Sequence, residues 1–309
     1  MKNGTRCGFA NVISVLAFAG ATASSLRAQE PFRSRCGAGA HVDERRGTVP
    51  LPQGTLLCPL VADPKFEQTF VSYLRGDFAT LADTSSTLDT NIGAVGLGDS
   101  FGLLRFAGAG AGGQVQIDLV GAIFAQFNLD TPSFDLINAD YLVGLPITYR
   151  LHGFSARARV YHQSSHLGDE YLLAQNPERE NLSFESAELL LSQEVGPLRV
   201  YAAGEKFFRA RPVDLTEYLG HAGIEYRPPA FGAGRLVAAL DAKVLEDANN
   251  EYRWALSARA GIEVARIPSP GHPPRIVSLL ATWYDGLAPY GQFYRDNIRF
   301  VGVGLHFAH

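Results

Sequence analysis

The sequence predicts an all-β fold, a transmembrane, antiparallel, up-and-down β-barrel of about 12 strands. Three observations predict it: a leader typical of exported proteins, long segments in which apolar and polar residues alternate, and connections that alternate between long and short. In barrels that cross a membrane, apolar side chains face lipid and polar ones face the lumen. We therefore expect the chain to reside in the bacterial outer membrane.

Residues 1–28 are predicted to be a secretory signal peptide. Lys2 and Arg6 provide a positive start, and the apolar run that follows over 9–23 is too short to span a bilayer. Residues 29–60 have a loop-like sequence and are predicted to form a periplasmic N-terminal extension, which leaves 61–309 as the barrel. No later apolar run is long enough for a transmembrane helix, so strands must make any membrane span.

The cysteines predict one disulfide. Removal of the signal peptide would remove Cys7 and leave Cys36 and Cys58, an even pair in an oxidising compartment. Their spacing does not suit a zinc site. We therefore expect Cys36 and Cys58 to be joined.

The strands are predicted from period-two alternation, which is clearest over 114–128, where Val115, Ile117 and Leu119 share one face. The predicted strands lie near 66–76, 100–107, 114–128, 140–150, 154–165, 181–195, 198–208, 217–227, 235–245, 252–265, 275–284 and 298–307. Longer connections, such as 77–99 and 166–180, follow the first strand and every second one after it, and mostly tight links follow the others. This pattern indicates long outer loops and short periplasmic turns, with both termini periplasmic.

Several local features add expectations. Pro146 lies inside a predicted strand, where it must interrupt the hydrogen-bond ladder, and we expect a bulge there. The last strand closes on Phe307, which resembles the C-terminal signature of outer-membrane barrels, although two residues follow it. Charged strand residues, Glu185 and Glu188 among them, are expected in the lumen. The aromatic residues expected in the membrane-interface girdles are Tyr141, Tyr149, Tyr226, Trp254, Trp283 and Tyr284.

The segment 161–173, YHQSSHLGDEYLL, concentrates reactive side chains. Alternation over 154–165 places His162 and Ser164 on the apolar face, which would face lipid near the outer end of the barrel. Residues two apart on a strand share a face, roughly 7 Å apart along the chain. An imidazole at that distance can reach a hydroxyl proton. The pattern predicts Ser164 as nucleophile and His162 as base.

A third group should orient the imidazole. The candidates are Asn181 at the head of the next strand, Asn176 in the loop, and Glu170. A separate hypothesis assigns a divalent cation to His166, Asp169 and Glu170, which could cooperate with catalysis.

The His-x-Ser pair of His162 and Ser164 resembles that of outer-membrane phospholipase A and lipid A deacylase, which also carry such a pair at the outer end of a barrel strand. The resemblance covers these two residues only. It implies Asn176, twelve positions after the serine, as the third member, calcium as the cation, and a dimer as the working form.

Longer segments resemble the bacterial family called domain of unknown function 1207. They are PLVADPKFEQTFVSY, GAIFAQFNLDTPSFDLINADYLVGLP, YHQSSHLGDEYLL and NLSFE, within a region from about Pro59 to the C-terminus. The resemblance implies an outer-membrane barrel and brings no activity with it.

Three classes of function remain open from the sequence: an interfacial lipid acyl hydrolase, a narrow solute channel, and a structural or binding barrel. A short His-x-Ser would also fit a hydrogen-bonded loop root in a barrel without activity. The expected partners are membrane lipids, lipopolysaccharide and the barrel-assembly machinery. A net charge of −4 predicts no overall electrostatic attraction to nucleic acid or to anionic lipid.

Overall fold

The computed structural model describes residues 47–78, 88–109, 112–177, 181–212, 215, 217–246, 251–265 and 276–308 of the 309-residue chain. The predicted signal peptide and Cys36 lie outside the described residues. The cleavage and the Cys36–Cys58 disulfide therefore stay predictions.

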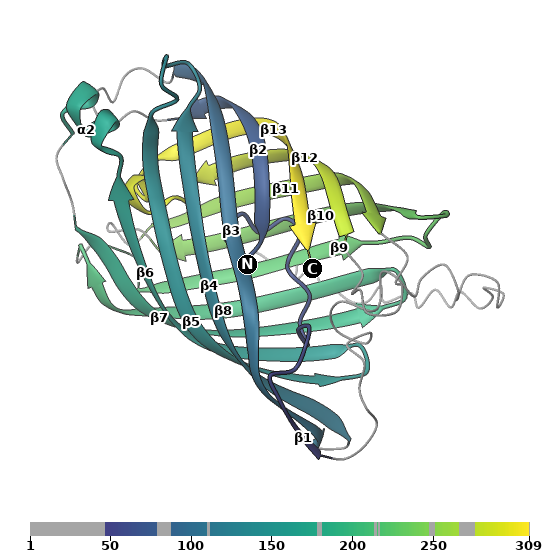
Figure 1. Cartoon of the computed structure of the whole chain (residues 1–309). Coiled ribbons are helices and arrows are strands. Elements are labelled where there is room, and N and C mark those ends of the chain that lie inside the picture. Colours follow the sequence, from purple (N-terminus) through teal and green to yellow (C-terminus); the bar gives the residue numbers. More distant parts are fainter. Residues whose placement is uncertain are drawn as a thin grey trace, which may run out of the picture.

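In the described part of the chain, twelve antiparallel strands form a closed barrel (Figure 1). Each strand pairs with its neighbour in sequence, and β13 closes the barrel on β2, with Phe307 opposite Thr69. The barrel strands are β2 Thr69–Phe78, β3 Leu88–Ala109, β4 Gly113–Asn128, β5 Leu136–Leu151, β6 Phe154–Leu167, β7 Leu182–Val195, β8 Leu198–Arg211, β9 Tyr218–Tyr226, β10 Gly234–Glu246, β11 Tyr252–Ala265, β12 Ile276–Leu287 and β13 Asn297–Ala308. The predicted fold class is confirmed.

Three short elements complete the described structure. Strand β1, Gly47–Pro50, pairs with β3 beyond the end of β2. Helix α2, Asp169–Gln175, lies in the β6–β7 connection, and the 3-10 turn η3, Gly291–Phe293, lies in the β12–β13 connection. Among the described residues, no helix is both long enough and apolar enough to cross a membrane.

The two faces of the strands are those that alternation predicts. Val160 on β6, Leu189 on β7 and Trp254 on β11 are about half exposed on the outer face, whereas Arg157 and Arg159 are buried inside. The exposed apolar side chains are the surface that lipid would cover. The prediction that Tyr284 belongs to a membrane-interface girdle is wrong. Tyr284 is buried and stacks on Phe300, with ring centroids 5.1 Å apart.

Strand β3 starts twelve residues earlier than predicted, so most of 77–99 is not a loop. The sequence there is rich in glycine, which weakens strand signals. The structure gives a reason for one glycine: a Cβ at Gly96 would collide with the ring of Phe70, which packs against this position from β2. Glycine here marks a close approach and not a turn.

The strand has no bulge at Pro146, so the expectation of a bulge there is wrong. The β5–β6 ladder runs through Pro146, which lies opposite Arg159, without a shift in register. On the other side, pairing stops at Ile117–Ile147 and resumes at Val120–Gly144 in the same register. Because proline has no backbone N–H, Pro146 interrupts the hydrogen-bond ladder on one side. The pairing register of β5 does not change at this point.

Residues 51–68, here called the lumen segment, run inside the barrel. Leu56, Leu60 and Ala62 in this segment are fully buried, and its backbone and side chains bond to inward-facing residues of eight strands. Those wall residues are Arg105, Gln116, Asp140, Arg150, Arg157, Arg159, Arg199, Glu225, Lys243 and Arg259. The described end of the predicted periplasmic extension thus lies in the lumen, and the boundary expected at residue 60 falls within one continuous segment.

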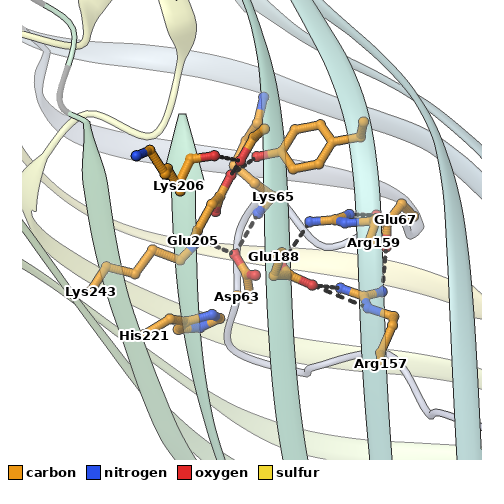
Figure 2. Close-up of polar contacts among 12 residues, drawn as sticks. Asp63, Lys65, Glu67, Arg157, Arg159, Glu188, Glu205, Lys206, His221 and Lys243 are labelled. Atoms are coloured by element: carbon orange, nitrogen blue, oxygen red, sulfur yellow. Dashed lines mark hydrogen bonds and ion pairs between the residues drawn. The ribbon is translucent and has the colours of Figure 1, made fainter. Parts of the chain in front are cut away.

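Three charged residues of the lumen segment have partners on the wall. Asp63 accepts from Lys243 Nζ at 2.7 Å (Figure 2). Lys65 Nζ donates to Asp140 at 2.5 Å. Glu67 accepts from both Arg157 and Arg159, and these two arginines also donate to Glu188. Each of these buried charges is matched, which is the condition for keeping ions in such an interior.

Candidate functional site

The candidate site lies on the outer face of β6, close to the end of the barrel that carries α2. His162 and Ser164 follow Val160 on this face, and the intervening Gln163 and Ser165 are buried inside. The His162 side chain is 44% exposed, and Ser164 is partly exposed. The strand alternation therefore presents both predicted groups to whatever surrounds the barrel.

Glu185 of β7 lies directly opposite His162 in the ladder. Its Oε1 lies 3.4 Å from His162 Nδ1, and its side chain is 32% exposed. The expectation that Glu185 lies in the lumen is wrong. The register decides this, because Leu182 and Phe184 fill the inner positions of β7 and leave Ser183 and Glu185 on the outside.

The geometry leaves the second imidazole nitrogen available. With Nδ1 turned toward the carboxylate, Nε2 is the nitrogen that can face a hydroxyl on the same strand. The Ser164 side chain makes no hydrogen bond to another described residue, so its hydroxyl can rotate toward the imidazole. Hydrogen bonds of this kind are often long before substrate binds.

Aromatic and hydroxyl groups border the serine. Tyr141 on β5 and Ser183 on β7 lie opposite Ser164 in the two flanking ladders. The Tyr141 ring contacts the His166 ring edge-on, with centroids 5.8 Å apart. A tyrosine at this height suits the boundary between lipid tails and headgroups.

The two asparagines predicted as third member lie elsewhere. Asn176 is the C-cap of α2 in a left-handed conformation, with its backbone N–H bonded to the Leu172 carbonyl. Asn181 is exposed and precedes the first residue of β7. Within the described residues neither bonds to His162, and Glu185 occupies the neighbouring position that they were expected to take.

The predicted cation ligands do not come together. His166 is exposed near the end of β6 and contacts Tyr141, while Asp169 and Glu170 are exposed in the first turn of α2. The described part of the chain contains no group of three His, Cys, Asp or Glu side chains arranged to hold a metal ion. A mixed His and carboxylate set also suits calcium poorly, since calcium prefers oxygen ligands.

Comparison with solved structures defines the class of protein. The outer membrane phospholipase A of Escherichia coli matches with a TM-score of 0.54 and 18% identity, over 81% of this chain and 92% of that one. The outer membrane phospholipase of Salmonella typhi, in a structure described as a dimer with bound calcium, matches with a TM-score of 0.51 and 17% identity, over 79% and 93%. At these identities the likeness shows the fold alone. The closed barrel is that of a bacterial outer-membrane protein.

The family follows from the sequence match. The model of the family described as protein of unknown function (DUF1207) matches residues 20–309, and the chain belongs to this family. A search of the curated proteins found no match.

Sequence reasoning missed two features of these sites. Glu185 was assigned to the wrong face, although the alternation of Leu182, Phe184 and Ser186 against Ser183 and Glu185 carried the signal. Asp140 belongs to the inner surface and accepts hydrogen bonds from Lys65, from Ser165 and from the backbone N–H of Gly291. Nothing local to Asp140 predicts these partners, which lie 25 to 151 residues away in sequence.

Proposed function

We propose that this barrel is an interfacial lipid acyl hydrolase that uses Ser164 as nucleophile and His162 as general base. One observation carries the proposal: on the lipid-facing side, His162 Nδ1 lies 3.4 Å from the Glu185 carboxylate, with Ser164 two residues away on the same face. A serine, a histidine and a carboxylate in this order are the parts of a serine hydrolase. Glu185 is the positioning residue.

The chemistry follows from these roles. Ser164 Oγ attacks the ester carbonyl carbon while His162 Nε2 takes the hydroxyl proton, and the same nitrogen returns that proton to the departing alcohol. Water then attacks the acyl-serine carbonyl carbon while His162 Nε2 accepts a proton from it. The bond from that carbon to Ser164 Oγ breaks, His162 returns the proton to Oγ, and a fatty acid is released. Glu185 holds the imidazole with Nδ1–H toward the carboxylate and stabilises its charged form.

The location supports a membrane lipid as the substrate. Most of the longer connections, the β6–β7 connection among them, lie at this end of the barrel, and in outer-membrane barrels such loops lie outside the cell. A lipid of the outer leaflet would place its acyl ester beside the headgroup boundary, where Tyr141 and His162 lie. Phospholipid and lipopolysaccharide are therefore the substrates to test. Because the Salmonella typhi phospholipase is described as a dimer with bound calcium, the assay should vary both calcium and protein concentration.

The narrow solute channel is the second candidate, and the lumen segment argues against it. The segment bonds to eight strands and buries apolar residues along the axis that a solute would need to follow. A barrel without activity remains the competing interpretation of the outer face.

The deciding experiment measures fatty-acid release. Purified, folded barrel is mixed with phospholipid or lipopolysaccharide micelles, with and without calcium, and wild type is compared with Ser164→Ala. Release that requires Ser164 is the expected result. Release that is absent from the folded protein, or equal without Ser164, would leave the barrel without this activity.

A further inference from the structure

A group of arginines lies on the outer face two strands from the candidate nucleophile. Ser164 on β6 faces Ser183 on β7, and Ser183 in turn faces Arg211 on β8. Two strand spacings separate Ser164 from Arg211, about 10 Å between backbones. Arg209 precedes Arg211 in the same strand, and both are exposed.

A bulge turns this part of β8 outward. The register shifts between Ser183 and Glu185, so that Arg211 pairs with Ser183 while Phe208 pairs with Glu185. As a result, Phe208 and Arg209 are consecutive and both exposed, and Arg209 has the left-handed backbone φ of 53°. Bulges re-aim side chains and occur beside active sites, and a left-handed residue other than glycine needs a compensating reason.

Among the described residues, the charged side chains near these two arginines are bonded to other partners. Lys206 on the same strand is paired with Glu217 at 3.3 Å and donates to the Tyr218 hydroxyl at 3.1 Å. Glu185 faces His162. Within the described residues, Arg209 and Arg211 make no ion pair and no side-chain hydrogen bond. With respect to the described residues, the guanidinium donors of this outer-face pair are therefore available to a ligand.

We propose that Arg209 and Arg211 bind the phosphate of an anionic lipid headgroup and so hold a phosphate-bearing lipid over Ser164. This inference rests on the proposed function and specifies its substrate class. Guanidinium groups bind phosphate oxygens in a planar, two-point manner, and cations at a membrane surface gain from anionic lipid. Placing an arginine in a membrane costs little near the lipid–water boundary, where the proposal places these two residues at the end of β8.

The spacing fits such a lipid. In a glycerophospholipid the glycerol unit separates phosphate from acyl ester, and in lipid A the sugar ring does so. Either linker suits a phosphate on β8 and an ester on β6, two strand spacings away. Phe208, which is 38% exposed between the arginines and Glu185, offers an apolar contact to the acyl chains.

The test measures binding in protein that cannot turn over. The Ser164→Ala barrel in uncharged detergent is titrated with phosphatidylglycerol, lipid A, and diacylglycerol with the same chains, and bound lipid is counted by native mass spectrometry. We expect the two phosphate-bearing lipids, or one of them, to bind in preference to diacylglycerol. Arg209→Gln with Arg211→Gln should weaken that binding roughly 30-fold. Which lipid responds identifies the source of the phosphate.

Two controls keep the test decisive. Arg299→Gln removes an exposed arginine on β13 that is already paired with Asp285, and it should change nothing. Arg209→Lys with Arg211→Lys keeps the charge and should recover part of the affinity, which also covers a failure of the glutamine variant to fold. Equal binding of diacylglycerol, or phosphate-lipid binding untouched by the double replacement, would overturn the proposal. Because Ser164 is already replaced, these results stand apart from whether wild type hydrolyses lipid.

Discussion

His162 and Glu185 face each other across the β6–β7 ladder on the outside of the barrel, with Nδ1 and Oε1 3.4 Å apart. The two residues are 23 positions apart in sequence and come from strands joined by the connection that contains α2. Their contact is a property of register, and it gives the His162–Ser164 pair the third group that the proposed acyl transfer requires.

Replacing either proposed catalytic residue should abolish the proposed turnover. Ser164→Ala removes the nucleophile and His162→Ala removes its base, and each should lower fatty-acid release on the order of 10⁴-fold or more. The double replacement should be little worse than either single one, because the two act as one unit. Migration of unboiled samples in detergent gels confirms that each variant is folded.

Glu185→Gln should lower turnover by between about 10²- and 10⁴-fold, because the amide cannot stabilise the charged imidazole or fix its tautomer. Glu185→Asp should recover part of the rate. The matched controls are Asn181→Ala and Asn176→Ala, which remove side chains that do not contact His162 and should leave the rate near wild type. A large loss with either asparagine variant, and none with Glu185→Gln, would assign the orienting role to the asparagine.

Glu67→Gln should loosen the lumen segment. Glu67 and Glu188 together match Arg157 and Arg159, so removing the Glu67 charge leaves two buried guanidinium groups sharing the single carboxylate of Glu188. Loss of one partner of a buried pair costs about 3–5 kcal/mol. Urea unfolding followed by tryptophan fluorescence should show a lower midpoint. Asp285→Asn breaks the exposed pair with Arg299 and should leave the midpoint nearly unchanged.

Local patterns predicted much of the fold. Period-two alternation gave the strand faces, including the outward direction of His162 and Ser164, because one face of each strand must be apolar. It failed at 88–99, where glycines such as Gly96 accommodate the ring of Phe70 from a neighbouring strand. When a side chain on another strand requires glycine at a position, the local sequence shows no periodic pattern that would predict the strand.

The partners of the site and of the lumen could not be predicted in the same way. Val61 N–H bonds to Glu225 across 164 positions, and Lys243 bonds to Asp63 across 180. The loop-like composition around Val61 predicted a periplasmic extension. The position of this segment in the lumen follows only from the closure of the barrel around it. Likewise, the sequence contains several residues that could orient His162. The pairing register of β6 with β7 places Glu185, and not the others, directly opposite it.

The predicted Cys36–Cys58 disulfide would have a testable effect on the lumen segment. Cys58 lies in this segment, and its carbonyl accepts from Arg199 Nη1 at 2.8 Å. A bond from Cys36 would tether the start of the segment and should stabilise it by about 3 kcal/mol through loop closure. Alkylation of the unreduced mature protein should modify neither thiol. Two modified cysteines in the mass spectrum would contradict the pairing.

The lumen should conduct poorly. A twelve-stranded barrel encloses limited space, and here the lumen segment occupies it, with Leu56, Leu60 and Ala62 fully buried and ion pairs from Asp63, Lys65 and Glu67 to the wall. An ion crossing the barrel would have to displace these contacts. We therefore expect purified protein in planar bilayers to give no steady ohmic step, while a general porin inserted in the same bilayers does. Brief openings should become more frequent in Glu67→Gln, because the weakened ion-pair network holds the segment less firmly. Steady conductance in the wild type, unchanged by Glu67→Gln, would instead show a permanent path past the lumen segment.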